Sequence, residues 1–491
     1  MKFYKQISAL VIGLFIVLLC ARTAQADPAS EQVMEKMLID LVGINQVPAH
    51  SVAIAMNGRV IAQATVGEKD IRNHITATNE TTFRLASVSK IIGATMLVKL
   101  VQDGLLDPDK PIGQYMPDLE QQYKVLTTRQ LLAHISGMPH YQAGDALIAA
   151  THYDSAIEGL ESVGDRSLLS KPGEEYLYSS HGYTILSALY ETITGKPLYQ
   201  SSAEFVGHMT GRATPVLEDV TKRNPIRSNV LEIGPNGPTT LKPKDQSYSP
   251  FATGYIATAA DLALFGDAVM NNPFISDDSR SMLFDPVRLN DGSDTGRYLY
   301  EVAFGWRVGV DISGRQVAHH AGITQGARSV LVIYPDSGLS IAFLSNSRWT
   351  SQIERSAFSL ANIILDGQTA TELNGRFNFS GTFDGKTING YLYCDIAVER
   401  CSLTDNGGAL SKWLVKYNYV ESHMQDWPAV ITRSSLGYQI KLVTTVGFVE
   451  LQPAPRTCGQ ACFVAELGNK LMIELHFEDQ SWFTDGIVHS K

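Results

Sequence analysis

The chain has 491 residues, of which 44% are hydrophobic and 18% are charged, and its formal net charge is −10. This length and an ordinary globular composition predict two or three folding units. Because the balance is acidic and no cluster of lysine or arginine occurs, the composition argues against binding to nucleic acid or to anionic lipid.

The N-terminus has the features of an export signal. Two lysines in MKFYKQ precede the apolar run ISALVIGLFIVLLCA, which is short for a membrane span but typical of a signal-peptide core. Ala24-Gln25-Ala26 follows as a small-x-small cleavage site, so residues 1–26 are predicted to be a signal peptide. A lipoprotein site at Cys20 is less favoured, because Leu19 is bulky where such sites carry a small residue. No later segment is long and apolar enough to cross a membrane, which predicts a soluble periplasmic or secreted protein.

The first predicted element after this signal is a β-hairpin. Residues 48–67 alternate apolar and polar side chains on either side of Asn57-Gly58, a dipeptide that suits a two-residue type I′ turn. From FRLASVSK (83–90) onward the apolar residues follow helical spacing, as far as Asp103-Gly104, which are typical of a helix end.

The middle of the chain is predicted to be helical with long connections. TTRQLLAHISGM (127–138) predicts a second helix, which starts at Thr127 or Thr128. Residues 199–250 contain many Gly, Pro and Asn and predict long loops with short elements. FATGYIATAADLALFGDAV (251–269) then predicts another helix.

Strand patterns return towards the C-terminus, in GWRVGVD, QVAHHAG, RSVLVIYP and LSIAFLSN. Early strands, a helical middle and late strands predict one sheet built from both ends of a domain over residues 27–366. After Asp366-Gly367 the segments are strand-like with almost no helical signal, which predicts a separate β domain over residues 368–491.

Four cysteines lie in the predicted β domain: Cys394, Cys401, Cys458 and Cys462. An even, clustered set in an exported protein predicts disulfides, and the local pairing 394–401 and 458–462 is favoured among three pairings. A four-cysteine zinc site is the alternative, but the C-x6-C and C-x3-C spacings fit it poorly. No metal is therefore predicted.

Ser87 and Lys90 are the first candidates for chemistry. At positions i and i+3 they share one face at the start of a helix, whose dipole favours negative charge on Ser87 and disfavours the charge on Lys90. A desolvated lysine can then act as a base for the hydroxyl. The alternative is a capping serine and a lysine that reaches solvent, which is the more frequent meaning of an isolated S-x-x-K.

Two further motifs carry reactive side chains. Tyr178 in YLYSSHGY follows a loop and precedes a helical run, and a tyrosine near two cations loses its proton more easily. His320 in VAHHAGITQG lies in a strand, where only one of the neighbouring histidines can face a given side. The alternatives are a core tyrosine with a satisfied hydroxyl and a structural histidine.

The order FRLASVSK, then YSSHGY about ninety residues later, then HHAG in a closing strand resembles the serine β-lactamase and penicillin-binding hydrolase family. The resemblance is to the branch with class C β-lactamases, D-alanyl-D-alanine carboxypeptidases, D-aminopeptidases and related esterases, and it covers roughly residues 30–365. It implies an α/β (α+β) fold. We expect a β-lactamase-like domain with a mainly antiparallel sheet flanked by helices and an all-helical subdomain. LNGRFNFSGTFDG resembles the start of the lipocalin-like domain of some members, so a small C-terminal β-barrel-like domain is expected to follow.

The resemblance also implies roles for individual residues. Ser87 is expected to be the acyl-accepting nucleophile and Lys90 its activating partner, while Tyr178 exchanges protons with the serine and the leaving group. His320 stands where many members carry lysine and others histidine. The backbone N–H groups of Ser87 and Ile323 match the family's oxyanion hole. No cofactor is implied.

Several positions depart from the family pattern or bear on the substrate. Ser180 replaces an asparagine that binds a substrate amide, and serine cannot offer the same paired donor and acceptor. Arg307 and Gln325 match residues of a secreted carboxypeptidase, in which the arginine binds the terminal carboxylate. The two threonines that flank Gly322 in that enzyme are Ala321 and Ile323 here.

These observations predict an exported serine hydrolase that acts through an acyl-enzyme on Ser87. Short peptides or amides with D-amino acids are the favoured substrates, followed by small acyl esters and then β-lactams. A non-catalytic penicillin-binding-like receptor is the alternative from another class, and the retained Ser87, Lys90, Tyr178 and His320 argue against it. The prediction includes a small-molecule or peptide substrate and leaves the oligomeric state open.

Overall fold

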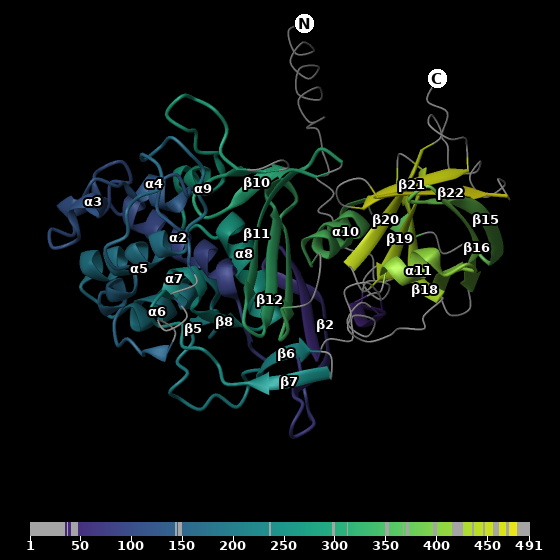
Figure 1. The fold of residues 1–491 in the computed structure, drawn as a ribbon, viewed down its shortest axis with the longest axis horizontal. Helices are drawn as coiled ribbons and strands as arrows, with labels where there is room; N and C mark the ends of the chain where they lie inside the picture. The colour runs from purple at the N-terminus through teal and green to yellow at the C-terminus, as the bar shows by residue number, and fades with distance from the viewer. Residues whose placement is uncertain are drawn as a thin grey trace, which may run out of the picture.

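The computed structural model describes residues 35–36, 38–40, 48–142, 145, 150–234, 237–296, 300–311, 313–348, 353–366, 368–369, 373–395, 400–414, 426–434, 437–444, 447–454, 461–467 and 471–478. The signal peptide predicted at 1–26 lies outside these residues. Figure 1 shows a sheet with helices beside it and, at the other end of the molecule, a second group of strands. Among the helices described, none has the length and apolar character that a membrane crossing requires.

An eight-stranded antiparallel sheet forms the centre of the larger part. Strand β1 pairs with β13, so strands from the two ends of this part of the chain meet in one sheet, as the sequence predicts. From edge to edge the order is β3 (Ile75–Thr76), β2 (Arg59–Asp70), β1 (Ala49–Met56), β13 (Leu339–Ser345), β12 (Ala327–Tyr334), β11 (Gln316–Thr324), β10 (Arg307–Val310) and β9 (Glu301–Val302).

Both faces of this sheet are covered. In β1, Ala53 and Ala55 belong to one apolar core, whereas Val52 and Ile54 belong to another, because successive side chains point to opposite faces. Helix α8 (Ala259–Asn271) packs on one face against β1 and β13, and α10 (Ile353–Asp366) packs against β12 and β13. Strands β1 and β13 are therefore buried along their whole length.

The hairpin between β1 and β2 has the predicted turn. Asn57 has φ 53° and Gly58 has φ 76°, and positive φ at both central residues defines a type I′ turn. Strand β2 continues to Asp70, beyond the predicted end of the hairpin.

The helical part lies beside the sheet (Figure 1) and surrounds α2, which packs against α7 and α9. Short strands β4 (Phe83–Arg84), β5 (Val216–Leu217) and β8 (Tyr255–Ala257) pair with each other, as do β6 (Val230–Gly234) and β7 (Gly237–Leu241). Besides α8, the helices of this part are α2 (Ser89–Gln102), α3 (Gln121–Lys124), α4 (Thr128–Leu132), α5 (His181–Thr194), α6 (Leu198–Thr210), α7 (Pro250–Thr253) and α9 (Asp277–Phe284).

The helix predicted over 251–269 was right only in part, because Tyr255–Ala257 form strand β8 and the long helix α8 starts at Ala259. Two other predictions of local structure were wrong. The helix predicted over 127–138 starts at a Thr127 capping box but ends at Leu132, because His134 (φ 59°) and Gly137 (φ 77°) leave the helical conformation. Part of the region predicted as loops, 199–250, forms the thirteen-residue helix α6, which ends before Gly211 in the left-handed conformation. Its apolar face packs against α8, a tertiary contact that local composition does not reveal.

The C-terminal strands close into a barrel. Eight strands form a ring, because β18 pairs both with β17 and with β19, while β14 (Gln368–Thr369) adds to β18 from outside. The ring follows the order β15 (Gly375–Phe383), β16 (Lys386–Asp395), β17 (Arg400–Asp405), β18 (Asp426–Ser434), β19 (Gly437–Thr444), β20 (Gly447–Pro453), β21 (Cys462–Leu467) and β22 (Leu471–Phe477). Helix α11 (Ala409–Leu414) packs on β17.

The barrel holds the cysteines that are described. Cys394 and Cys401, opposite each other on β16 and β17, form a disulfide. Cys462 is also disulfide-bonded. Its sulfur is therefore not a free thiolate, although Cys462, Glu474 and His476 lie as close together as metal ligands do. Cys458, its predicted partner, lies outside the described residues.

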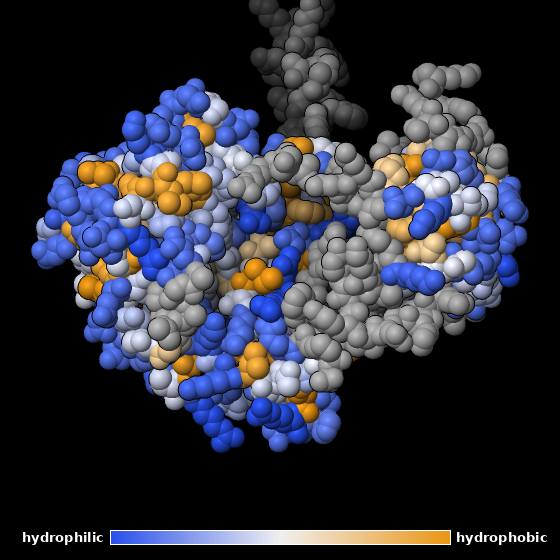
Figure 2. All heavy atoms as spheres, viewed as in Figure 1, coloured by the Kyte–Doolittle hydropathy of each residue, from blue (hydrophilic) through white to orange (hydrophobic). Residues whose placement is uncertain are grey.

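Helix α10 joins the two parts. It packs against β12 and β13 on one side and against β18 and β20 of the barrel on the other, and Figure 1 shows it between the sheet and the barrel. Glu450 on β20 accepts hydrogen bonds from Asn362 of α10 and from the fully buried Lys441 of β19, at 3.3 Å and 2.8 Å. Apolar side chains of α10, such as Leu360 and Ile364, belong to the same core as those of the barrel. Figure 2 shows hydrophilic side chains with smaller hydrophobic patches on the face towards the viewer.

Candidate active site

Ser87 lies in a one-turn 3₁₀ helix, Ala86–Val88, between strand β4 and helix α2. Ala86 has φ 47°, a left-handed conformation that costs energy in any residue with a side chain. The sharp turn leaves Ser87 partly exposed, while its neighbours Ala86 and Val88 are buried. The helix start that the sequence predicts at Ser87 is therefore a strained turn that presents the hydroxyl.

Lys90, one turn into this segment, is fully buried. Its Nζ lies 3.3 Å from Oγ of Ser87, 3.1 Å from Oγ of Ser180 and 3.1 Å from the carbonyl oxygen of Ala252. Among the residues described, no carboxylate pairs with it. Burial lowers the pKa of Lys90, and the positive charge of Arg307 lowers it further, although Tyr178 opposes this. Lys90 is therefore held by three neutral oxygens in a site that favours the free amine.

Tyr178 precedes α5 and lies over Lys90, whose Nζ is 5.1 Å from the centre of its ring. Burial by itself would raise the pKa of the phenol. The charge of Lys90, polar interactions with Ser87 and Lys90, and the charge of Arg307 act against burial and lower the Tyr178 pKa overall. The phenol is thus adjacent to the serine and the lysine and can exchange protons with them.

His320 on β11 faces the same site, and its ring centre lies 6.2 Å from that of Tyr178. The neighbouring His319 contacts Phe358 of α10, so the two histidines lie on opposite faces of the strand, as predicted. Nδ1 of His320 donates to the carbonyl oxygen of Ala321 at 2.7 Å. Burial, and then the charges of Arg307 and Lys90, keep the His320 pKa well below its usual value. The ring is neutral, with Nε2 as an acceptor.

Gly322 allows β11 to approach the serine turn closely. A side-chain carbon at this position would lie 2.3 Å from the carbonyl oxygen of Leu85 and 2.9 Å from the backbone nitrogen of Ser87. Ser329 fixes the same turn by donating to Leu85 O at 2.5 Å. Ile323, the next residue of β11, has an exposed side chain. Only Gly322 therefore permits the packing that brings the backbone of β11 beside Ser87.

The two other predicted substrate-binding residues differ in position. Arg307 pairs with His319 of β11, and its guanidinium lies 4.9 Å from the centre of the Tyr300 ring. Its charge lowers the pKa of Lys90, Tyr178 and His320. Its Nε is buried and has no hydrogen-bond partner among the described residues. Gln325 lies in the β11–β12 turn, next to Gly326, which packs against β6, and the described contacts do not connect it with Ser87.

The sequence did not single out two histidines that complete the site. The ring of His134 is centred 4.3 Å from that of Tyr178, and its Nδ1 accepts from the N–H of Ser179 at 3.1 Å. Nδ1 of His140 accepts from the N–H of Ser180 at 3.2 Å. The sequence predicted a helix over the segment that contains His134, so this histidine was not expected at the site. The left-handed conformation of His134 turns the chain towards Tyr178 instead.

The arrangement combines the parts needed for acyl transfer. A partly exposed hydroxyl lies beside an amine that favours its neutral form and a phenol with a lowered pKa. Such a group of side chains can activate a nucleophile and return its proton to a leaving group. The backbone at Ser87 and β11 lies where developing negative charge on oxygen would need donors.

Comparisons with known proteins agree with this geometry. The family model described as Beta-lactamase matches residues 34–362. Human mitochondrial serine beta-lactamase-like protein LACTB is 24% identical over 407 residues, covering 65% of this chain and 74% of that protein. The D-amino acid amidase from Ochrobactrum anthropi, solved in complex with D-phenylalanine, has a TM-score of 0.58 at 20% identity, covering 69% of this chain and 98% of its own. The octameric penicillin-binding protein homologue from Pyrococcus abyssi has a TM-score of 0.58 at 16% identity, covering 90% and 99%.

Proposed function

The chain belongs to the beta-lactamase family, and from this premise we propose that it is a serine hydrolase that forms an acyl-enzyme on Ser87. The observation that carries the proposal is the position of Lys90. A buried lysine without a carboxylate partner among the described residues, 3.3 Å from a serine hydroxyl, is costly for stability and useful for catalysis.

The proposed reaction has two steps. Oγ of Ser87 forms a bond to the carbonyl carbon of the substrate, and its proton passes to the coupled pair of Lys90 and Tyr178. The backbone N–H groups of Ser87 and Ile323 stabilise the negative oxygen. The bond to the leaving group then breaks, and the proton moves to the leaving nitrogen or oxygen. Water attacks the acyl-serine, its proton returns through the same pair to Oγ, and the acid leaves. Neutral His320 supports Tyr178 and carries no charge into the site.

As substrates we favour short peptides or amides that contain D-amino acids. The D-amino acid amidase that shares the fold supports this class. The charge of Arg307, which lowers the pKa of His320, supports it too, because a guanidinium binds a terminal carboxylate well. The export predicted from residues 1–26, and the disulfide between Cys394 and Cys401, support a periplasmic or secreted location, where disulfides persist.

A small acyl ester is the second candidate substrate. Ser180 donates no amide hydrogen bond of the kind that asparagine offers, and its hydroxyl already accepts from Lys90 at 3.1 Å. The exposed Ile323 adds an apolar surface beside the serine turn. These two features favour an acyl group that is recognised by apolar contact.

The test is covalent labelling followed by turnover. Intact-protein mass after treatment with a fluorophosphonate is expected to show one adduct on wild type and none on Ser87→Ala. Ser89→Ala is the matched control, because that hydroxyl accepts from the N–H of Tyr255 and not from Lys90. A D-amino-acid peptide, a D-amino-acid amide, a nitrophenyl ester and a chromogenic cephalosporin then identify the substrate class. Absence of an adduct on folded wild type would reject the acyl-enzyme.

A further inference from the structure

With serine at position 180, the site has no asparagine to bind an amide of the substrate. In the family pattern, this position carries an asparagine that binds a substrate amide, and here the hydroxyl of Ser180 is engaged by Lys90. A donor for the acyl half of the substrate must therefore come from another residue, provided that the proposed hydrolase function holds.

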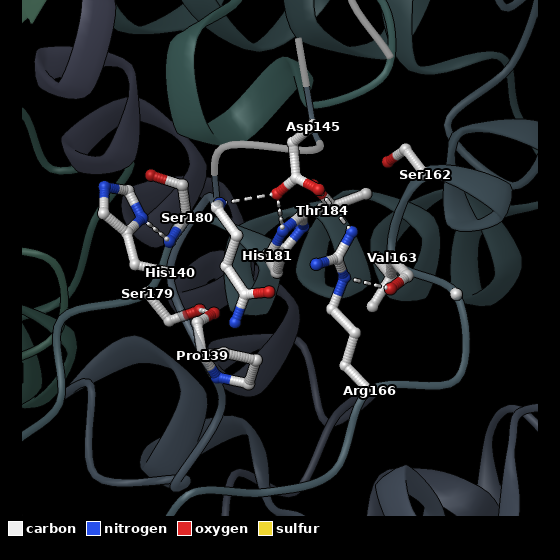
Figure 3. Close-up of polar contacts among 12 residues, drawn as sticks. Pro139, His140, Asp145, Ser162, Val163, Arg166, Ser179, Ser180, His181 and Thr184 are labelled. Carbon is white, nitrogen blue, oxygen red and sulfur yellow. Dashed lines mark hydrogen bonds and ion pairs between the residues drawn. The ribbon is translucent and has the colours of Figure 1, made fainter. Parts of the chain in front are cut away.

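His140 presents such a donor. The backbone N–H of Ser180 donates to Nδ1 of His140 at 3.2 Å, so Nδ1 carries a lone pair and the neutral ring must carry its proton on Nε2. Figure 3 shows this contact, with the other ring nitrogen on the far side of the imidazole from Ser180. Nε2 has no hydrogen-bond partner among the described residues, and the side chain is exposed.

The ring stays neutral at physiological pH. Although part of the residue is exposed, desolvation of its ring, followed by the electrostatic effects of Lys90 and His181, lowers the pKa of His140 to about 4, against a small opposing effect of Asp145. His140 therefore donates one hydrogen bond without adding a charge. It also lies at the catalytic cluster, since its ring centre is 5.3 Å from that of Tyr178.

The segment that carries His140 is held on both sides. Oγ of Ser179 donates to the carbonyl oxygen of Pro139 at 2.7 Å, directly before His140. Further along, Asp145 contacts Nε2 of His181 at 3.2 Å and accepts from Arg166 at 2.6 Å. Figure 3 shows these contacts grouped around the start of α5. The contact at Pro139 and the hydrogen bond from Ser180 to Nδ1 hold His140 before a substrate binds, which lowers the entropic cost of recognition.

The charges around the site decide which acyl groups suit this donor. Arg307 supplies positive charge, and Asp145 is already engaged by His181 and Arg166. A free ammonium group on the substrate would meet repulsion without a paired carboxylate, whereas a carbonyl oxygen would gain a hydrogen bond.

We propose that Nε2–H of His140 donates to an amide carbonyl oxygen in the acyl half of the substrate, in place of the missing asparagine. The site then selects acyl groups whose amine is acylated, as in a peptide, over those that end in a free amine. This inference rests on the proposed hydrolase function and narrows its substrate class.

The test compares two nitrophenyl esters of equal length, an N-acetyl-aminoacyl ester and an alkanoyl ester without the amide. The measured quantity is the ratio of their kcat/KM values, with the amide-bearing ester preferred by wild type. His140→Ala and His140→Phe are each expected to lower this ratio about fivefold to tenfold, the value of one hydrogen bond. His140→Phe retains the ring packing, so it remains informative if His140→Ala fails to fold. His140→Gln, which keeps an acceptor and a donor, is expected to restore at least half of the preference.

His208→Ala, an exposed histidine on α6 that stacks on Phe274, serves as the control and should leave both kcat/KM values unchanged. Equal turnover of the two esters by wild type, or a ratio within twofold of wild type in both His140→Ala and His140→Phe, would overturn the role of His140. These outcomes differ from failure of the proposed function, in which neither ester is turned over and Ser87 forms no adduct.

Discussion

The Nζ atom of Lys90 lies 3.1 Å from Oγ of Ser180, slightly closer than its 3.3 Å to Oγ of Ser87. Ser180 thus contacts Lys90, which lies ninety residues earlier in the sequence. This contact orients the amine towards Ser87 without supplying a negative charge that would keep it protonated.

Replacement of this amine should separate activity from stability. Lys90→Met removes the base but keeps a chain of similar volume, so kcat/KM is expected to fall by about 10²-fold to 10⁴-fold. Removal of the desolvation cost of this buried amine offsets the lost hydrogen bonds, so the Tm should stay close to that of wild type. Calorimetry and ester turnover on the same preparation measure both. A Tm lower by tens of degrees would mean that Lys90 is a structural residue.

The pH dependence of kcat/KM should report the Lys90 pKa. Activity is expected to rise with pH as Lys90 loses its proton. Tyr178 raises the Lys90 pKa, so Tyr178→Phe should move this acidic limb to lower pH while it reduces the rate.

Arg307 acts on Lys90 in the opposite sense. Its charge lowers the Lys90 pKa, so Arg307→Gln should move the acidic limb to higher pH. The pair of variants is its own control, because a general loss of active enzyme would shift neither limb. Shifts of both variants in one direction would contradict the assignment of the limb to Lys90.

Arg307 should also distinguish substrates by their free carboxylate. Arg307→Ala is expected to raise KM about tenfold or more for a peptide with a free C-terminal carboxylate, because a charge-assisted hydrogen bond is lost. The amidated peptide should retain its KM in the same variant. Equal increases for the two peptides would reject a carboxylate contact.

The contact between the barrel and α10 should respond to acid. Burial would raise the Glu450 pKa, but the charge and hydrogen bond of Lys441, together with Ser359 and Asn362, lower it overall. A lowered pKa in the folded state contributes stability that is present above the unfolded pKa and is lost as pH falls through the folded value.

Glu450→Gln should therefore flatten the fall in Tm as the pH drops below about 4.5, the ordinary pKa of a glutamate. It should also lower the Tm at neutral pH, because Lys441 would remain buried and unpaired. Glu175→Gln, at an exposed position before α5, is the control and should leave the profile unchanged. An unaltered acid limb in Glu450→Gln would show that this carboxyl does not contribute.

Local sequence predicted those features that a few adjacent residues determine. Asn57-Gly58 specifies its turn because both residues tolerate positive φ, and Thr127 starts α4 because its side chain caps the first turn. The same local patterns predicted too long a helix for α4, because nothing in the apolar spacing shows that His134 adopts φ 59°. It also missed α6, whose helical state depends on packing against α8.

The sequence by itself determined the family motifs, including the segment that contains Ser87, and the division into helical and strand-rich regions. These features follow from short-range chemistry and spacing. Tertiary structure alone decided that the barrel closes through β18 and β19, and that His134 and His140 join Tyr178 and Ser180. Such contacts join residues far apart in the chain, and they form only when burial of the apolar faces brings those segments together.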